Sequence, residues 1–386
     1  MEVTAVEPVL LSHVYPDDVT LEWSAGTIES WDAALVRVET DEGYVGWGEA
    51  GHALTGTAAV PGVVEALRDQ VIGRDPADVL AIRDAMYDRN LFWARGALPQ
   101  GVIGAIEIAL YDVLGQARGE PVYRLLGGRA KEAGRVETYG SGGIAADIEG
   151  RVEQAVEFAD RGFDTVKIRA VAEPMANVEL VERVIAALGD GVQVALDAVQ
   201  GTAGSPWSVT EAIRLGTALE DHAHRIAWYE EPCQVENLDG YRRVRDAVSL
   251  PVTGIESRTG RYEFREVLEA GAVDVLQPDV TIAGGFDETR RVSALGAAHD
   301  VPLFLHVWGT GVSLMANAHF AAADANTPLI EYCQLPNPLR EDLLPTDLER
   351  DGSTITLPET PGLGLDVPDD LSDRFAFVPG KGHVFD

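Results

Sequence analysis

Lysine is almost absent from this chain. Only three lysines occur among 386 residues, Lys131, Lys167 and Lys381, whereas 27 arginines are present. Acidic residues outnumber basic ones, because 63 aspartates and glutamates leave a formal net charge of −33. Nucleic acid and anionic membrane surfaces are therefore excluded as partners, since their phosphate groups would repel the chain. The acid is spread along the whole sequence, so we expect a solvated acidic surface and a halophilic protein, whose self-repulsion is screened by high salt.

Cysteine and long apolar runs are scarce as well. The two cysteines, Cys233 and Cys333, lie 100 positions apart without any CxxC pairing. This spacing excludes a thiolate zinc site and a disulfide-rich scaffold, and a small buried thiol is the simplest interpretation of each. No stretch of 18 apolar residues occurs, and the N-terminal MEVTAVEPVL has no basic segment ahead of an apolar one. We therefore expect a soluble, cytoplasmic protein.

The sequence divides into three regions, which we place at residues 1–130, 131–345 and 346–386. The first region predicts an α+β domain, with antiparallel strands at Val3–Leu11, Ala34–Val38 and Tyr44–Trp47 and helices at 60–72, 76–90 and 104–116. In the second region short apolar runs alternate with amphipathic helices. The last region returns to short strands and turns, and we expect it to pack back on the first domain.

The alternation in the second region predicts a barrel. Eight short strands are expected, at Val136–Tyr139, Thr165–Arg169, Val192–Asp197, Ile226–Glu230, Val252–Glu256, Val273–Gln277, Pro302–Val307 and Leu329–Cys333. Eight strands separated by amphipathic helices favour a closed parallel barrel over an open sheet. One helix start is explicit, because Ser208 and Glu211 have the spacing of a capping box.

Ionisable residues recur at the ends of these strands. Seven of them are separated by 23 to 33 residues, namely Lys167, Asp197, Glu230, Glu256, Asp279, His306 and Glu331. In a parallel barrel the carboxyl ends of the strands meet at one rim, where active sites are assembled. The repeat therefore predicts one catalytic centre built from many strands.

Three carboxylates, those of Asp197, Glu230 and Glu256, end neighbouring strands. Like charges at close range raise one another's pKa unless a cation is bound between them. Hard oxygen ligands with room for water and substrate favour Mg²⁺ over zinc. The alternative is that each carboxylate only caps the helix that follows it.

Two further sets of residues indicate proton transfer and substrate binding. Asp279 and His306 follow adjacent strands, so the carboxylate can orient the imidazole and raise its basicity. A lone histidine near a strand end is otherwise a structural residue. Lys167 and Arg169 share one face of their strand, where both cations can bind a substrate carboxylate.

Several motifs, spread over nearly the whole chain, resemble the enolase superfamily and within it the mandelate racemase and muconate lactonizing enzyme group. They are Gly46-Trp-Gly-Glu-Ala50, Ala109-Leu-Tyr-Asp-Val-Leu-Gly115, Tyr123-Arg-Leu-Leu-Gly-Gly128, Lys167-Ile-Arg169, Asp197, Glu230-Glu-Pro232, Glu256, Gln277-Pro-Asp279, Gly284-Gly285 and His306. The resemblance implies a (β/α)7β modified TIM barrel. It also implies an α+β capping domain, formed by the N-terminal region and the C-terminal tail, that closes over the substrate.

The same resemblance implies roles for the repeated residues. Asp197, Glu230 and Glu256 would bind Mg²⁺, and the reaction would remove the proton α to a carboxylate. Lys167 and Glu331 would stabilise the resulting enolate. His306, held by Asp279, would be the base.

Arg169 departs from the family pattern. Racemases of this group carry Lys-x-Lys and use the second lysine as a base on the opposite face, but an arginine does not readily lose its proton near neutral pH. A one-base β-elimination is therefore favoured over racemisation or epimerisation. Val199 is a second departure, because relatives often carry asparagine there, which leaves a contact to a substrate hydroxyl unfilled or moved to Gln200.

The sequence after strand seven looks most like members that act on sugar acids, both galactarolactone cycloisomerases and aldonate or aldarate dehydratases. We favour dehydration of a sugar acid to a 2-keto-3-deoxy acid, with lactone cycloisomerisation as the alternative. Trp308 and the cap residues Trp23 and His52 are candidate substrate contacts, although Trp23 and His52 also read as ordinary loop residues. A homo-oligomer is expected from the family, and a catalytically idle structural barrel remains the alternative from another class.

Overall fold

The structure is a computed structural model that describes residues 1–16, 19, 21–23, 26–51, 53–128, 134–145, 147–380 and 382–385. Its N-terminal region contains a three-stranded antiparallel sheet in the order β1 (Val3–Val14), β4 (Ser30–Thr40) and β5 (Val45–Glu49). Gly43, with a φ of 84°, lies in the tight turn between β4 and β5, a conformation that favours glycine. The predicted meander is confirmed.

Helices α2 (Val60–Leu67), α3 (Val79–Asp88) and α4 (Ala97–Arg118) follow this sheet. Helix α4 begins seven residues before the predicted start, because Pro99 lies in its first turn, where a missing N–H is tolerated. By length and composition α4 could cross a membrane, but 83% of its apolar window is buried inside the protein. This burial is typical of a core helix.

Close backbone contacts hold α4 in place. A side chain at Gly48 of β5 would meet the carbonyl oxygen of Ala105 at 1.9 Å, and one at Gly104 would meet the backbone nitrogen of Gly285 at 2.5 Å. Glycine therefore lets the sheet approach one face of α4 and the barrel approach another. Helix α4 is the main joint between the two parts.

Eight parallel strands form the barrel. They are β6 (Arg135–Ser141), β7 (Thr165–Arg169), β8 (Gln193–Asp197), β9 (Ile226–Glu230), β10 (Val252–Gly254), β11 (Val275–Leu276), β12 (Phe304–Leu305) and β13 (Leu329–Cys333). The order β11-β10-β9-β8-β7-β6-β13-β12 is closed by a parallel bridge between Leu276 and Leu303. The expected (β/α)7β barrel is therefore confirmed.

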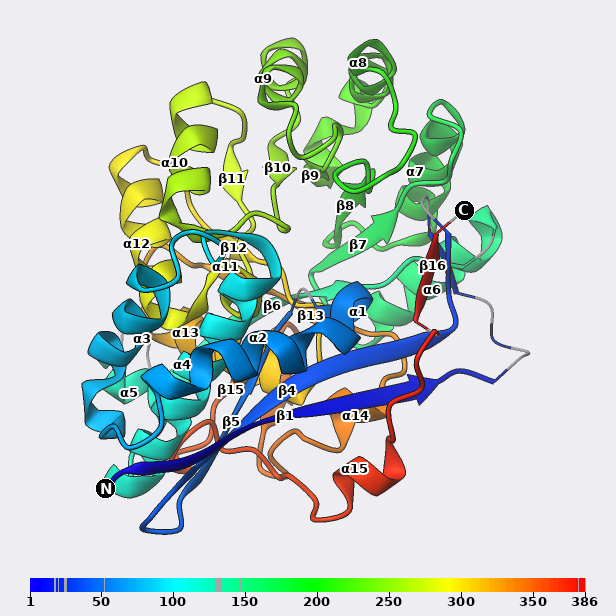
Figure 1. The fold of residues 1–386 in the computed structure, drawn as a ribbon. Coiled ribbons are helices and arrows are strands. Elements are labelled where there is room, and N and C mark those ends of the chain that lie inside the picture. Colours follow the sequence, from blue (N-terminus) through cyan, green and yellow to red (C-terminus); the bar gives the residue numbers. More distant parts are fainter. Residues whose placement is uncertain are drawn as a thin grey trace.

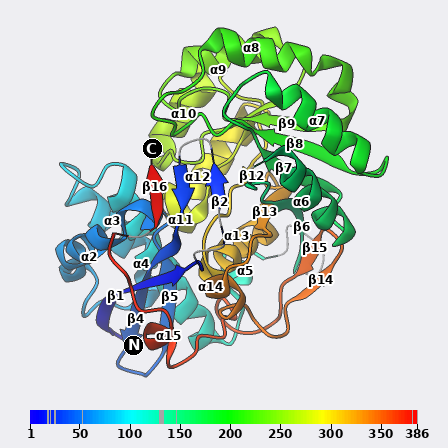
Figure 2. The same ribbon diagram turned by 90° about the vertical axis from the view of Figure 1, so that its right-hand side faces the viewer.

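Helical segments make the seven connections between these strands. They are α6 (Ile148–Asp160), α7 (Ala176–Ala187), α8 (Val209–Ala218), α9 (Leu238–Ala247), α10 (Gly260–Ala270), α11 (Val280–Ala283) with α12 (Gly285–Ala298), and α13 (Gly311–Ala323). Figure 1 shows α7 to α10 outside the strands, and Figures 1 and 2 both place the N-terminal sheet to one side of the barrel. The predicted capping box at Ser208 and Glu211 is present at the start of α8.

Four barrel strands are shorter than predicted, and β8 lacks only its first predicted residue, Val192. Strand β10 ends at Gly254 because Gly254 and Ile255 both have positive φ, 137° and 76°, which turns the chain out of the sheet. Strand β11 ends before Gln277-Pro278, since proline cannot donate to a ladder. Strand β12 covers only Phe304–Leu305. An apolar run in the sequence does not show where the backbone turns out of the sheet, so the predicted strands were too long.

The C-terminal tail contacts both parts of the molecule, the barrel first and the N-terminal region farther along the chain. Strands β14 (Glu349–Asp351) and β15 (Thr354–Thr356) form a hairpin, and β15 pairs antiparallel with barrel strand β6. Farther on, α15 (Leu371–Arg374) lies beside β1, and β16 (His383–Phe385) pairs with β3 (Gly26–Ile28). The domain boundaries themselves stay a prediction.

Candidate active site

The seven repeated residues lie at the rim of the barrel. Lys167 and Arg169 are on β7, and Asp197 and Glu230 end β8 and β9. The register pairs Arg169 with Asp197 and Asp197 with Glu230. The other members follow or belong to the remaining strands, with Glu256 after β10, Asp279 after β11, His306 after β12 and Glu331 within β13.

Lys167 is the centre of a buried ion cluster. Its Nζ lies 2.6 Å from Oε1 of Glu230, 3.1 Å from Oε1 of Glu331 and 3.6 Å from Oδ2 of Asp197. Burial opposes its charge, but Glu230 and Glu331 raise the pKa of Lys167 well above its usual value. The lysine is therefore a fixed cation. Lys167 also holds the pKa of Glu331 at about 2, although burial of that carboxyl acts in the opposite direction.

Two of the three candidate metal ligands, Asp197 and Glu256, have raised pKa values. Burial, followed by the charge of Glu230, raises the pKa of Asp197 to about 7, and burial also raises the pKa of Glu256. Glu230 accepts hydrogen bonds from Nε1 of Trp228 at 2.7 Å and from Nε2 of Gln277 at 3.0 Å. These two donors orient Glu230 and hold its carboxylate at the base of the site.

The donor set fits a hard divalent cation in its chemistry. Three carboxylates come from adjacent strands, and a bound cation would lower the raised pKa values of Asp197 and Glu256. Within the described part of the chain, no three acidic, histidine or cysteine side chains are arranged to ligate one ion as they stand. The residue types support a metal site, and the ligand assignment stays a prediction.

Three carboxylates lie within ion-pair distance of His306, and those of Asp279 and Glu256 are the nearest. Nδ1 of His306 lies 3.1 Å from Oδ2 of Asp279, and its Nε2 lies 3.6 Å from Oε1 of Glu256. Burial opposes the charged ring, but Glu256 and the hydrogen bond with Asp279 raise the pKa of His306 to about 10. A cation held by Glu256 would reduce this effect, because it cancels part of the carboxylate charge.

Asp279 is itself fixed by residues that the sequence did not indicate. Its Oδ1 accepts hydrogen bonds from N and Oγ1 of Thr281, at 2.8 and 2.7 Å, and from Nδ2 of Asn317 at 2.9 Å. Thr281 lies in α11 and Asn317 lies in α13. Their positions carry no recognisable signal, because Asn317 is 38 residues away along the chain.

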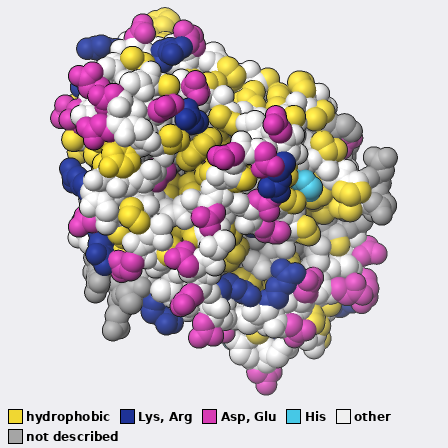
Figure 3. Space-filling model, turned by 90° about the horizontal axis from the view of Figure 1, so that it is seen from below, with side chains coloured by type: hydrophobic (Ala, Val, Ile, Leu, Met, Phe, Trp, Pro, Cys, Tyr) yellow, Lys and Arg dark blue, Asp and Glu magenta, His cyan; other side chains and the backbone are white. Residues whose placement is uncertain are grey.

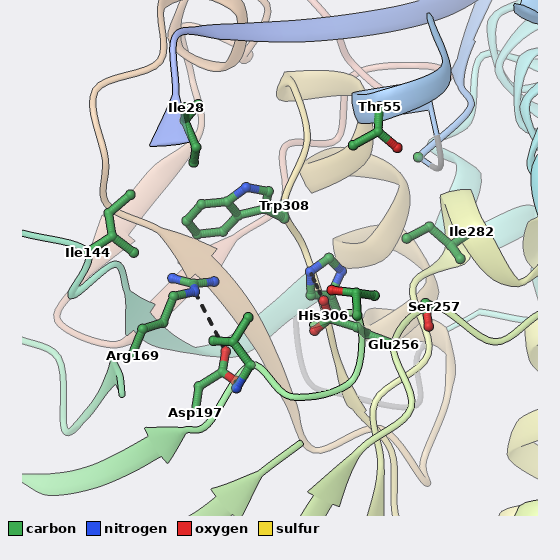
Figure 4. A pocket seen from close by; sticks show the side chains of 13 residues that line it. Ile28, Thr55, Ile144, Arg169, Asp197, Glu256, Ser257, Ile282, His306 and Trp308 are labelled. Atoms are coloured by element: carbon green, nitrogen blue, oxygen red, sulfur yellow. Dashed lines mark hydrogen bonds and ion pairs between the residues drawn. The ribbon is translucent and has the colours of Figure 1, made fainter. Parts of the chain in front are cut away.

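Arg169 lies across the pocket from His306 (Figure 4). Its guanidinium carbon is 4.1 Å from the centre of the Trp308 ring, and its Nη1 donates to the carbonyl of Gly142 at 2.7 Å. Trp308 in turn packs on Trp31 of β4, with ring centres 5.1 Å apart. The capping sheet thus supports the tryptophan on which Arg169 is stacked.

A cavity of about 170 Å³ brings many of these groups together. Arg169, Asp197, Glu256, His306 and Trp308 line it. Ile28 of the capping domain, Ile144 and Ile282 add an apolar rim (Figure 4).

The remaining predicted site residues are placed differently. Lys167, Glu230 and Glu331 are fully buried and are not among the lining residues. His52 lies outside the described residues, and so does the side chain of Trp23. Their proposed contacts stay predictions.

Family comparison identifies the chain. Residues 6–127 match the family model of the mandelate racemase and muconate lactonizing enzyme N-terminal domain, and residues 150–371 match the enolase C-terminal domain-like family. The chain belongs to the enolase superfamily. Both halves of this superfamily member are therefore accounted for, the cap by the first match and the barrel by the second.

Relatives of this superfamily member are enzymes. It is 35% identical to D-galactarolactone cycloisomerase of Agrobacterium fabrum over 97% of this chain and 99% of the relative. It is 33% identical to D-galactonate dehydratase of Verminephrobacter eiseniae over 87% of this chain and 89% of the relative. The crystal structure of 3,6-anhydro-D-galactonate cycloisomerase from Zobellia galactanivorans aligns with a TM-score of 0.86 at 27% identity, over 97% of this chain and 99% of that chain. The protein is a lyase or an isomerase of this superfamily, which sets aside the idle barrel.

Proposed function

We propose that this enzyme dehydrates a sugar acid, an aldonate or aldarate, to a 2-keto-3-deoxy acid in a Mg²⁺-dependent reaction. One observation carries the proposal: among the described residues that line the pocket His306, held by Asp279, is the one histidine, and the opposite side of the pocket carries an arginine. Arg169 keeps its proton near neutral pH, so it does not serve as a second base. Elimination needs only one base, whereas two-base racemisation needs two.

The roles of the other residues follow from charge. Asp197, Glu230 and Glu256 would hold Mg²⁺, and when bound the ion supplies positive charge against the charge that develops on the substrate carboxylate. Lys167 provides a fixed positive charge beside them, because its pKa is raised well above its usual value. Arg169 would bind and orient the substrate from the side of Trp308.

The proton transfer is assigned to Nε2 of His306, the ring atom that faces Glu256. His306 removes the α-proton, and the C–H electron pair moves onto the substrate carboxylate to give an enolate. The enolate electrons then form the double bond to the β-carbon as the β C–O bond breaks. The departing hydroxide takes the proton from His306 and leaves as water. The enol product then becomes the 2-keto-3-deoxy acid.

Lactone cycloisomerisation is the second candidate, favoured by the similarity to D-galactarolactone cycloisomerase over nearly the full length of both chains. The same α-proton would leave, but the β-oxygen expelled would remain covalently part of the molecule. The two reactions therefore share the base and differ in the leaving group.

A screen of acid sugars and their lactones, with Mg²⁺ and KCl, tests both reactions. Mass spectrometry separates them, because dehydration lowers the mass by one water and cycloisomerisation leaves it unchanged. We expect a 2-keto product lighter by one water. A product of unchanged mass from a lactone alone would replace the first proposal by the second, and absence of both would contradict the two.

A further inference from the structure

A second cavity lies on the outer wall of the barrel. It has a volume of about 390 Å³, and three arginines, Arg161, Arg340 and Arg350, are among the residues that line it. None of its lining residues lines the active-site cavity. A volume of roughly 300–1,000 Å³ is typical of small-molecule sites.

The most buried of the three is Arg340, only 5% exposed. Its Nη2 donates to the carbonyl of Leu335 at 2.6 Å, and its guanidinium carbon lies 6.0 Å from the centre of the Tyr332 ring. Its Nη1 is buried and has no hydrogen-bond partner. Leaving a buried donor of a charged group without an acceptor costs free energy. A ligand that supplies the missing acceptor to this nitrogen would remove that cost.

Arg350 is held over an aromatic ring. Its guanidinium carbon lies 4.8 Å from the centre of Phe163, whose ring meets Tyr332 edge-on at 6.3 Å. Its Nη2 donates to the carbonyl of Arg161 at 3.1 Å. Among the described residues no carboxylate lies within ion-pair distance of Arg350, so its charge is not neutralised.

Arg161 is the third arginine that lines the cavity. Its Nη1 donates to the side-chain oxygen of Gln334 at 3.0 Å, and its Nη2 pairs with Glu157, which stands outside the cavity lining. Stacking on rings and bonding to carbonyls fix the directions of all three guanidinium groups.

The charge of this cavity is opposite to that of the chain. Three guanidinium groups face one lining carboxylate, Glu341, whose Oε1 is 3.5 Å from Nη2 of Arg340. The whole chain carries −33. On the face seen in Figure 3, acidic side chains are widely spread, with Lys and Arg side chains interspersed among them. Arginines held together in an acidic protein indicate a site for a ligand of negative charge.

We propose that this three-arginine cavity binds a phosphoryl group, either as inorganic phosphate or on a phosphorylated sugar acid. Glu341 pairs with Arg340 and Glu157 pairs with Arg161, so the positive charge of Arg350 remains for a bound phosphate to neutralise. The phosphate oxygens match the fork of the guanidinium group, and one of them can accept from the unpartnered Nη1 of Arg340.

Binding is measured by calorimetry and by the shift in melting temperature, with inorganic phosphate at fixed KCl. The test variant is Arg350→Gln. The matched control is Arg265→Gln, because Arg265 is also a surface arginine over an aromatic ring, 5.5 Å from the centre of Tyr262. We expect saturable binding that weakens by about tenfold or more in Arg350→Gln and stays unchanged in Arg265→Gln.

A second arm of the experiment compares 6-phosphogluconate with gluconate. Gluconate has no phosphoryl group, so its binding reports on the active site. If 6-phosphogluconate binds more tightly than phosphate and loses this advantage in Arg350→Gln, the ligand is a phosphorylated sugar acid. Equal affinities for 6-phosphogluconate and inorganic phosphate would identify free phosphate as the ligand. Absence of saturable phosphate binding, or affinities in Arg350→Gln equal to those of the wild type, would overturn the proposal.

Discussion

The pairing of Asp279 with His306 fixes which ring nitrogen can accept a proton. Oδ1 of Asp279 is occupied by Thr281 and Asn317, and only Oδ2 faces Nδ1 of His306. A carboxylate at this position accepts from Nδ1–H and leaves Nε2 free as the base. An amide would donate to Nδ1 instead and place the proton on Nε2.

Asp279→Asn is therefore expected to lower kcat by about 10²-fold or more, because His306 would be held in the wrong tautomer. The melting temperature should change little, since Asn keeps the oxygen that accepts from Thr281. Asp274→Asn is the control, because Asp274 lies at the opposite end of β11 and pairs with Arg245. Wild-type kcat in Asp279→Asn would exclude the assigned role of Asp279.

Glu107 of α4 gives a pH prediction that is independent of the reaction. Burial raises the pKa of Glu107 to about 8, its Oε1 accepts from the backbone of Asp287 at 2.8 Å, and its Oε2 has no partner. In the unfolded chain a glutamate has a pKa of about 4.3. Between these values the folded state holds a proton that the unfolded state has released, so the stability contributed by Glu107 falls as pH rises.

Glu107→Gln should remove this dependence and keep the bond to Asp287. We expect the variant to gain about 1–3 kcal/mol over the wild type in the free energy of unfolding as pH rises from 5 to 9. Denaturant titrations at the two pH values measure it, with Glu65→Gln on the exposed face of α2 as control. A difference that does not vary with pH would show that Glu107 is ionised throughout.

At the level of single residues, the sequence indicated the groups that end strands but missed their supports. His306, Asp279 and Lys167 stood out because they recur with the strands. Thr281, Asn317 and the stacking of Trp31 on Trp308 depend on how distant elements pack, which strand spacing does not contain. Buried carboxylates such as Glu107 carry no signal in a chain with 63 acidic residues.

Among the elements, helix α4 joins the capping sheet to the barrel through glycine contacts. At Gly104 a methyl group would approach backbone atoms of Gly285 and Gly284 at 2.5 and 2.8 Å. Backbone cannot rotate away as a flexible side chain can, so the two parts would have to separate slightly. The joint therefore depends on the absence of a side chain at this position.

Gly104→Ala should lower the free energy of unfolding by about 1–3 kcal/mol. Gly62→Ala is the matched control, because Gly62 lies inside α2 with nothing within 4 Å of the added methyl group. The control should gain about 0.5–1 kcal/mol, since alanine is the better helix former. Equal changes in both variants would argue against a close contact between α4 and the barrel.

Strand bounds were predicted correctly where the backbone stays extended over the whole apolar run. Strands β7, β9 and β13 have the bounds expected from their apolar runs. Strand β10 ends earlier than expected because Gly254 and Ile255 have positive φ, and β11 ends earlier because Pro278 follows. In the tail, β15 pairs with barrel strand β6. A short tail strand pairs with whichever strand has unpaired backbone groups within its reach. The tail sequence alone does not show which strand that is.

For the whole molecule, the net charge of −33 implies self-repulsion in dilute buffer. At molar salt the screening length is only about 3 Å, so repulsion between distant surface carboxylates is largely removed. We expect the melting temperature to be higher in molar KCl than in dilute buffer. An uncharged osmolyte of equal osmolality is the control, and equal melting temperatures in the two salt conditions would contradict a surface adapted to high salt.

The proposed reaction requires one base, His306, to remove the α-proton of a sugar acid. NMR in deuterium oxide tests this requirement, with the substrate that the screen identifies and with Mg²⁺ present, by comparing the wild type with His306→Asn. We expect the wild type to break the α C–H bond and form product, whereas the variant should form no product and incorporate no deuterium at the α-carbon. Deuterium incorporation that persists in His306→Asn would contradict it and would place a base on the Arg169 side.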